Sequence, residues 1–233
     1  MNKTEFIEEV AKLNITLTKE MLEKLEQYYE ILVEENNKYN LTAITKKEDV
    51  YLKHFYDSLT LSKIIELDNQ SLCDIGTGAG FPGLVLKIVF PNLKVTLVDA
   101  TEKKCNFLKS VIKKLNLQNI NVIHDRAEIY SKETREQYDI VTSRAVAPLK
   151  HLLEYSIPLV KVKGIYIAMK SDISKELDGI SNYEKKLSIQ EKKILTFKLP
   201  IEESNRTLIS YKKVFPTSLL YPRKYTEIKK KSL

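Results

Sequence analysis

The sequence predicts an α/β fold built on a doubly wound, mainly parallel sheet, preceded by a helical extension. Three observations favour it. Short apolar runs alternate with helical patterns from residue 71 onward, a glycine-rich turn follows the first run, and the runs around 194–197 and 208–211 alternate like paired late strands. Strands that alternate with helices are typical of a parallel sheet, and we expect the late pair to form an antiparallel edge.

Residues 1–66 are expected to be a helical extension packed on a core domain of residues 67–233, which ends in a basic tail. Thr18 begins a helix whose apolar positions recur at helical spacing as far as Val33, and Tyr51 to Ile65 resume that spacing. Such an apolar face needs a surface to cover. A chain of 233 residues is long enough for one α/β core plus this appended element.

The parallel strands of the core are expected at residues 71–75, 95–99, 119–124, 138–142 and 164–169. Helices are expected to begin near Leu84, at Thr101 as a capping residue, at His151 and at Ser174, the last running to Lys186. Pro82 suits the first turn of the helix that follows the glycines.

The run from Cys73 to Gly83 holds four of the six glycines of the chain and predicts a turn that cradles a nucleotide. A dinucleotide fingerprint that starts at Gly76 requires a third glycine where this chain has Phe81. Asp74 places a carboxylate where it would repel a pyrophosphate but hold an ammonium group. A nucleoside that bears an amino acid, such as S-adenosylmethionine, satisfies both conditions, and Gly76 and Gly78 let the backbone approach it closely.

Further cofactor candidates follow the next strands. Asp99 ends its strand about 20 residues beyond the glycines, where a carboxylate accepts hydrogen bonds from ribose hydroxyls. Ligands of an open α/β sheet lie outside the carboxyl ends of the strands. Ala127 and Glu128 therefore fall where an adenine edge is read, and the fourth strand delivers Arg144 to the same rim.

The charge of the chain is unevenly distributed. The net charge is +7, and residues 151–233 carry 17 basic against 9 acidic side chains. Tyr211, Tyr221 and Tyr225 stand among these cations, as in proteins that contact phosphates and stack on bases. A solvated, lysine-rich surface is the alternative interpretation.

Two cysteines and three histidines without ligand spacing predict neither a disulfide framework nor a metal site. The amino terminus lacks the order of a signal peptide, and no apolar stretch approaches 18 residues. We therefore expect a cytoplasmic protein with no membrane and no metal partner, and a monomer.

Five motifs together resemble a known family. They are Asn40-Leu41-Thr42-Ala43-Ile44, Lys53-His54-Phe55-Tyr56-Asp57-Ser58-Leu59, Gly80-Phe81-Pro82-Gly83, Ser143-Arg144-Ala145-Val146-Ala147 and Tyr221-Pro222-Arg223-Lys224. Their order is similar to that of the bacterial 16S ribosomal RNA guanine-N7 methyltransferase family RsmG, also called glucose-inhibited division protein B (GidB). The match runs from about Tyr28 to the tail.

The resemblance implies a class I S-adenosylmethionine-dependent methyltransferase fold and methylation of N7 on the guanine conventionally numbered 527. Its substrate would be 16S ribosomal RNA or a small-subunit assembly particle. The tail departs from the family pattern after Lys224, where Tyr225 to Ile228 replace small residues and a proline. The cofactor contacts that the resemblance implies are Gly76, Phe81, Asp99, Ala100, Thr101, Ala127, Glu128 and Arg144.

Guanine N7 carries an in-plane lone pair, so attack on a sulfonium methyl group needs no general base. The enzyme mainly has to align the reacting atoms and exclude water. The candidates for this work are Arg144, His54, Asp57 and Lys170, with Lys53, Arg223 and Lys224 expected to contact RNA. Ordinary ion pairs and packing are the alternatives for each of them.

Other functions remain open on the sequence. A methyltransferase for a small molecule or a protein would share the cofactor loop but need no basic surface. A nicotinamide oxidoreductase conflicts with Asp74 and with the missing third glycine. An RNA-binding module without catalysis is the remaining reading.

Overall fold

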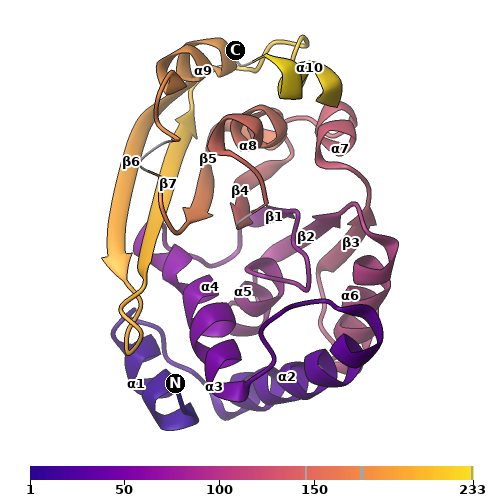
Figure 1. Cartoon of the computed structure of the whole chain (residues 1–233), viewed down its shortest axis with the longest axis vertical. Helices are drawn as coiled ribbons and strands as arrows, with labels where there is room; N and C mark the ends of the chain where they lie inside the picture. The colour runs from indigo at the N-terminus through magenta and orange to yellow at the C-terminus, as the bar shows by residue number, and fades with distance from the viewer. Residues whose placement is uncertain (145, 174–175, 232) are drawn as a thin grey trace.

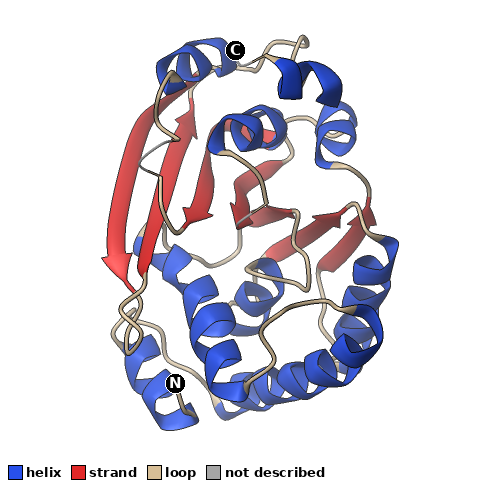
Figure 2. Cartoon of the chain, in the orientation of Figure 1, coloured by secondary structure: helices blue, strands red, loops and turns tan. Residues whose placement is uncertain are grey.

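The fold is a seven-stranded sheet with helices on both faces, seen in a computed structural model that describes residues 1–144, 146–173, 176–231 and 233 (Figures 1 and 2). The strand order is β3-β2-β1-β4-β5-β7-β6. The first five strands are parallel, and β7 and β6 form the antiparallel edge, so the predicted sheet is confirmed. The strands are β1 (Ser71–Ile75), β2 (Lys94–Asp99), β3 (Ile120–His124), β4 (Tyr138–Arg144), β5 (Val160–Lys170), β6 (Ile189–Lys198) and β7 (Asn205–Lys213).

Alternate side chains of the strands divide the core into two layers, because successive residues of a strand point to opposite faces. Leu72 and Ile140 face a layer formed by α1, α2, α5 and α6, whereas their neighbours Cys73 and Val141 face a layer that contains α8 and α9. The helices of the core domain are α5 (Gly83–Val89), α6 (Glu102–Lys114), α7 (Ala127–Glu133), α8 (Leu149–Ser156), α9 (Ile180–Leu187) and α10 (Tyr225–Lys230).

The helical extension packs on the glycine-rich turn. Tyr28 of α2 stacks on Phe55 at 5.6 Å between ring centroids and lies 5.5 Å from Phe81, and its hydroxyl donates to the Ala79 carbonyl. The apolar face of α2 thus lies against the turn, and the division into an extension of residues 1–66 and a core domain stays a prediction. The extension consists of α1 (Lys3–Ala11), α2 (Lys19–Tyr39), α3 (Lys47–Val50), a π-helical stretch (Tyr51–Tyr56), α4 (Asp57–Leu59) and a 3-10 turn (Thr60–Lys63).

Some predicted boundaries differ from the structure. The fourth and fifth strands are longer than expected, because β4 continues to Arg144 and β5 begins at Val160. The helix expected over 174–186 is observed as α9 from Ile180, and residues 174 and 175 lie outside the described residues. Thr101 precedes α6 as expected, but its side chain makes no capping hydrogen bond.

Candidate active site

The candidate site lies where the order of the strands reverses, between β1 and β4. At this switch point the chain continues from β1 to one side of the sheet and later returns to the other side, which leaves a crevice at the carboxyl ends. Two cavities of about 790 and 420 Å³ open there, and both are lined by Gly76 and Arg144. The switch point therefore offers two adjoining compartments, which we call the larger and the smaller cavity.

The glycine-rich turn forms one wall of both cavities, and its backbone needs glycine. Gly80 has φ +105°, and a Cβ there would lie 2.6 Å from the Tyr28 hydroxyl. Gly78 has φ +62°, but nothing lies within 4 Å of the position of its Cβ. Backbone at Gly78 therefore faces open space at the edge of the smaller cavity.

Asp74 shapes this turn from below and does not line either cavity. The carboxylate is fully buried, and its Oδ2 accepts hydrogen bonds from Thr77 Oγ1 at 2.6 Å and from the Gly83 amide at 2.8 Å. Burial raises the pKa of Asp74 to about 6. The sequence predicts that Asp74 contacts the ammonium group of a ligand directly. The turn lies over the carboxylate, so this geometry does not offer that contact.

Asp99 lines the larger cavity, and its predicted contact with ribose stays a prediction. Its Oδ2 accepts from the Gly78 amide at 2.9 Å and its Oδ1 from the Thr101 amide at 2.9 Å. Each carboxylate oxygen can accept more than one hydrogen bond, so these contacts orient Asp99 and leave it acceptor capacity. Thr101 itself supports Asp99 through its backbone and is not among the residues that line the cavity.

The other cofactor candidates also line the larger cavity. Ala100, Ala127 and Glu128 form its wall beyond Asp99. The Arg126 side chain donates through Nε to Glu128 Oε1 at 2.5 Å, which fixes the position of that carboxylate. The sequence thus placed Asp99, Ala100, Ala127 and Glu128 at one cavity, although their binding roles stay predictions.

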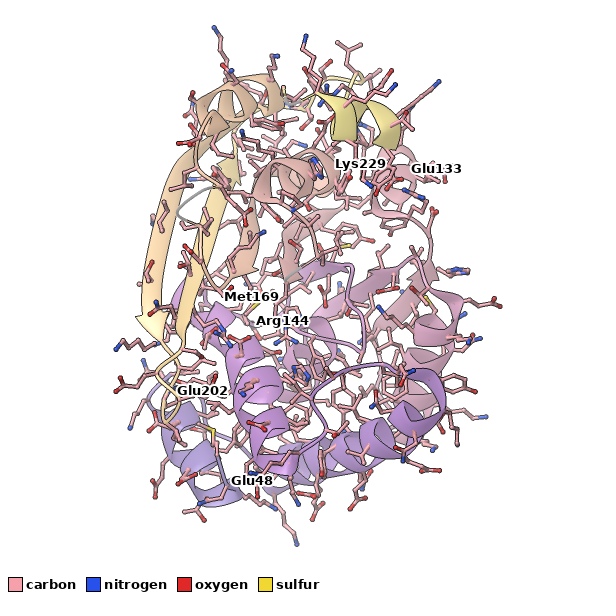
Figure 3. The ribbon with its side chains drawn as sticks, in the orientation of Figure 1. Glu48, Glu133, Arg144, Met169, Glu202 and Lys229 are labelled. Carbon is pink, nitrogen blue, oxygen red and sulfur yellow. The ribbon has the colours of Figure 1, made fainter. Side chains whose placement is uncertain are left out.

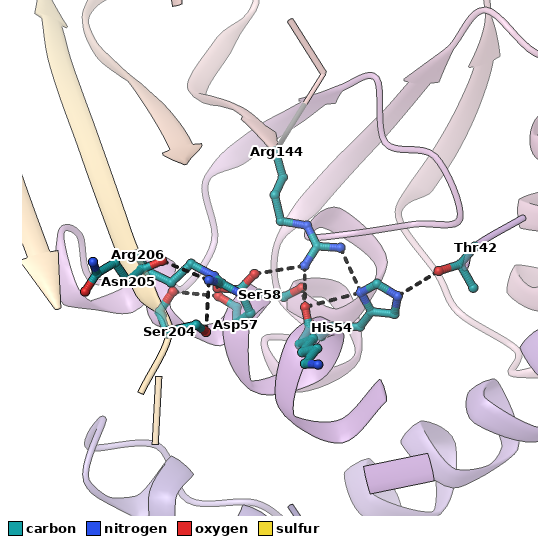
Figure 4. A network of polar contacts seen from close by, with 10 residues as sticks. Thr42, His54, Asp57, Ser58, Arg144, Ser204, Asn205 and Arg206 are labelled. Carbon is teal, nitrogen blue, oxygen red and sulfur yellow. Dashed lines mark hydrogen bonds and ion pairs between the residues drawn. The ribbon is translucent and has the colours of Figure 1, made fainter. Parts of the chain in front are cut away.

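A polar network crosses the smaller cavity and joins the extension to the sheet (Figure 4). Arg144 Nη1 donates to Asp57 Oδ2 at 3.0 Å and to the Lys53 carbonyl at 2.8 Å, while Nη2 lies 3.1 Å from His54 Nδ1. On the other side, Arg206 Nε of β7 donates to Asp57 Oδ1 at 3.0 Å. One buried carboxylate is thus shared by two guanidinium groups, which leaves a net positive charge on the three.

His54 is a neutral member of this network. Burial and the neighbouring Arg144 lower the pKa of His54 to about 3. The guanidinium of Arg144 is only a donor, so in its contact with His54 Nδ1 the ring nitrogen accepts, which places the proton on Nε2, 3.0 Å from Thr42 Oγ1. The Lys53 carbonyl lies 3.2 Å from the same Nδ1, but it already accepts from Arg144 Nη1. The imidazole also stacks on Phe81 at 4.2 Å between ring centroids. His54 therefore positions Arg144 and Phe81 and carries no charge.

Phe81 occupies the place that a dinucleotide-binding loop gives to glycine, and the structure gives a reason. Its ring packs between His54 and Tyr28, and the guanidinium carbon of Arg144 lies 5.2 Å from its centroid. A glycine there would remove the surface against which these side chains are ordered.

The two lysines predicted near this site are held by acids. Lys170 donates to the Ala147 carbonyl at 2.6 Å and pairs with Glu176 at 2.9 Å, with its side chain only 9% exposed. Lys53 pairs with Asp49 and Glu202, at 3.3 and 2.9 Å. Both lysines line the smaller cavity, but contact with RNA phosphate would have to compete with these ion pairs.

Arg223 differs from its predicted RNA role. Its guanidinium donates to both carboxylate oxygens of Glu154, at 2.8 and 2.7 Å, and Glu154 is fully buried. This bidentate pair turns the cation inward, which argues against its use as a phosphate ligand. The neighbouring Lys224 is exposed, and its RNA contact stays a prediction.

Sequence reasoning missed several residues of the two cavities. Thr42 was noted only within a motif, and Arg206 on a late strand carried no signal because its partner Asp57 is 149 positions away. Tyr225 and Lys229 of α10 line the larger cavity, although the tail was expected to contact RNA. Only the folded sheet brings these residues together.

The described residues contain no group of three or more His, Cys, Asp or Glu side chains arranged to hold a metal ion. Cys73 and Cys105 are buried free thiols, and burial raises the pKa of each. Within the described ranges, no helix has the length and apolar character that crossing a membrane requires.

Comparison with known proteins gives a consistent result over most of the chain. The family model described as rRNA small subunit methyltransferase G matches residues 21–209. Two proteins named ribosomal RNA small subunit methyltransferase G, from Bacillus cytotoxicus and Bacillus subtilis, are 47% and 45% identical to this chain. In both cases the match covers 96% of this chain and 95% of the relative.

Solved structures share the fold at low identity. A SAM-dependent methyltransferase from Aquifex aeolicus superposes with a TM-score of 0.55 at 14% identity, covering 74% of this chain and 96% of that one. TYW2 from M. jannaschii in complex with AdoMet gives 0.53 at 14% identity, covering 64% and 72% of the two chains. The sheet described above is therefore a class I methyltransferase fold, as predicted.

Proposed function

This chain belongs to the rRNA small subunit methyltransferase G family and is a ribosomal RNA methyltransferase, and we propose that it moves the methyl group of S-adenosylmethionine to N7 of guanine 527 in 16S ribosomal RNA. One observation carries the proposal. The larger and smaller cavities adjoin at Gly76 and Arg144, so a cofactor and a target base can meet at one point.

The residues present fit this cofactor. Asp99 keeps acceptor capacity at the rim of the larger cavity, which suits ribose hydroxyls. The backbone at Gly78 borders open space, and a ligand can approach it closely. Beneath the turn, Asp74 Oδ1 is buried with no hydrogen-bond partner among the described residues, which leaves negative potential under the part of the turn where a cationic ligand would lie.

The reaction is a single displacement. When bound, S-adenosylmethionine would supply a sulfonium methyl group: the N7 lone pair would form the new carbon–nitrogen bond as the carbon–sulfur bond breaks, with the sulfur leaving as a neutral thioether and the positive charge passing to the guanine. No proton has to move, so the chain needs no base, and His54, whose pKa is lowered to about 3, is left to position Arg144.

The work of the chain is therefore positioning and exclusion of water. Phe81, His54 and Arg144 form a packed wall where the two cavities meet. The net positive charge on Asp57, Arg144 and Arg206 attracts the phosphates that flank a target base. Holding the reacting atoms in line in such a site contributes several kcal/mol, up to about 7 to 11 for well-oriented reactants.

The proposal is tested by mapping methylated guanines. Unmethylated 16S ribosomal RNA, free or in assembly particles, is incubated with the protein and radiolabelled S-adenosylmethionine, and N7-methylguanine is located by chemical cleavage. We expect one cleavage site, at guanine 527. Label at another atom or position would contradict the proposal, and label in a protein or small molecule instead of RNA would favour the alternative acceptor class.

Related parts of the proposal follow from its substrate. The enzyme would act in the bacterial cytoplasm, where the small subunit is assembled, and without a metal ion. We also propose that it works as a monomer. Sedimentation of the protein at working concentration tests this last point.

A further inference from the structure

The segment that follows β7, residues 214–231, is tied to the core domain along its length, and we call it the C-terminal strap. Arg135, which lies between α7 and β4, donates to the Tyr221 carbonyl at 2.7 Å and to the Thr217 carbonyl at 2.6 Å. A guanidinium that holds two backbone carbonyls fixes the path of the strap and has little left for outside ligands.

A second tie lies two residues beyond Tyr221. The buried Glu154 of α8 accepts three hydrogen bonds from Arg223: from the backbone amide at 2.9 Å, from Nε at 2.8 Å and from Nη2 at 2.7 Å. Next, Ile228 of α10 is only 2% exposed and anchors the helix by apolar burial. The strap is therefore a seated part of the domain and not a loose basic arm.

The strap ends over the larger cavity. Tyr225 and Lys229 of α10 line that cavity together with Asp99, Ala127 and Glu128, which are the residues expected at the ribose and the adenine. In Figures 1 and 3, α10 with Lys229 lies at the same end of the molecule as α7, which carries Glu128.

Tyr225 is held in place by cations. The guanidinium carbon of Arg126 lies 4.4 Å from the centre of the Tyr225 ring, and Lys229 Nζ lies 4.8 Å from it. Arg126 also donates to Glu128 Oε1, so a continuous series of contacts joins the strap to the carboxylate at the adenine end. Cation–π contacts of this kind fix the orientation of a partly exposed ring.

We propose that the C-terminal strap is part of the cofactor site, with Tyr225, positioned by Arg126, forming the outer wall of the adenosine end and contacting the nucleoside. This inference rests on the proposed function, because it requires S-adenosylmethionine in the larger cavity. In this arrangement Arg223 does not contact RNA but anchors the strap to Glu154. The residues after Lys224, which differ from the family pattern, then form part of the wall of the nucleoside cavity and not an RNA-binding surface.

The test is the affinity of the full-length chain for S-adenosylmethionine and S-adenosylhomocysteine, measured by calorimetry. Tyr225→Ala is expected to weaken both affinities roughly tenfold, because the ring that contacts the nucleoside is lost. Tyr225→Phe keeps the ring and is expected to bind within about twofold of the wild type. Thr226→Ala, an exposed neighbour on α10 that does not line the cavity, is the matched control and should bind normally.

Affinity for 16S ribosomal RNA and the melting temperature are measured on the same variants. We expect RNA affinity to be unchanged in Tyr225→Ala, and ligand-free melting to shift little. Unchanged cofactor affinity in Tyr225→Ala would overturn the inference, above all if RNA binding fell instead. If the wild-type chain did not bind S-adenosylmethionine, the proposed function would fail as well, so the two failures are distinguishable.

Discussion

Arg144 Nη1 lies 3.0 Å from Asp57 Oδ2, and this ion pair joins the last residue of β4 to the helical extension. The Asp57 side chain is only 6% exposed and that of Arg144 15%, so water screens their attraction weakly. The extension is thereby a structural part of the site, because it supplies the acid that orients Arg144.

Arg206 shares Asp57 with Arg144 but lines only the smaller cavity. Arg206→Ala is therefore expected to lower the rate of RNA methylation roughly tenfold or more, since a charged donor is lost beside the target base. Affinity for S-adenosylmethionine should change by less than about twofold, because Arg144 keeps Asp57 paired. Calorimetry and single-turnover methylation separate the two effects. Lys198→Ala, at an exposed position, serves as control. Equal losses of cofactor affinity and methylation rate in Arg206→Ala would contradict this assignment.

Asp99→Ala is expected to reduce affinity for S-adenosylmethionine to below detection in calorimetry. The carboxylate both accepts ribose hydroxyls in our proposal and holds the Gly78 amide at 2.9 Å, so its loss removes a ligand and loosens the turn. Glu102→Ala, an exposed acid in the first turn of α6, should bind normally. Retained affinity in Asp99→Ala would count directly against the ribose role.

The glycine-rich turn provides two alanine variants that should differ in how much stability they lose. Gly80→Ala places a Cβ 2.6 Å from the Tyr28 hydroxyl at φ +105°, so a loss of about 2 to 3 kcal/mol in the free energy of unfolding is expected. Gly78→Ala meets no atom within 4 Å and should cost about 1 kcal/mol of backbone strain. Its methyl group projects into the open space of the smaller cavity, so it should lower the rate of RNA methylation more than stability. Urea unfolding and single-turnover methylation measure both, and a reversed order of stability would contradict the geometry.

Because His54 stays neutral in the folded chain, the free energy of unfolding should depend on pH. Its pKa is about 3 in the folded chain, while an unfolded histidine titrates near about 6.5. Between these values the unfolded chain binds a proton that the folded chain does not, so stability is lost as the pH falls below about 6.5. Relative to His54→Gln, the wild type should lose up to about 1.4 kcal/mol per pH unit in this window. Urea unfolding of both proteins at roughly pH 7.5, 6 and 5 tests this. If the free energies of unfolding of the two proteins changed in parallel with pH, the His54 ring would take up its proton in the folded chain as readily as in the unfolded chain.

Arg223→Ala should destabilise the fold, because it leaves the fully buried Glu154 carboxylate without its cationic partner and with only the backbone amide as donor. A loss of about 3 kcal/mol in the free energy of unfolding is expected for breaking such a pair. Lys224→Ala, at the exposed neighbouring position, should leave stability within about 0.5 kcal/mol of the wild type. Thermal unfolding of the two variants compares them directly. Equal stability would mean that the carboxylate finds water or another donor.

The sheet, its antiparallel edge and the glycine-rich turn were predictable because their signals are local. Short apolar runs mark the strands, with residues alternating in the late pair, and the glycines between Cys73 and Gly83 mark the turn. Asp99, Ala127 and Glu128 were also placed correctly at one cavity, since the carboxyl ends of parallel strands meet at one edge.

The remaining errors concern the partners of charged side chains. Whether Lys170 reaches phosphate or Glu176, and whether Arg223 faces RNA or Glu154, depends on packing between distant segments. Asp74 was expected to face a ligand, but the fold of the turn over its carboxylate turns it inward. Sequence shows which charges exist, whereas their pairing follows from the tertiary structure.

The position of Asp57 in the chain has a consequence for biosynthesis. As the polypeptide leaves the ribosome, this acid emerges well before Arg144 and long before Arg206, from which it is separated by 149 positions. A nascent chain that stops between these arginines holds its acid with half of its eventual counter-charge. The cation-rich pocket is thus complete only after β7 has been made and both arginines can reach the acid.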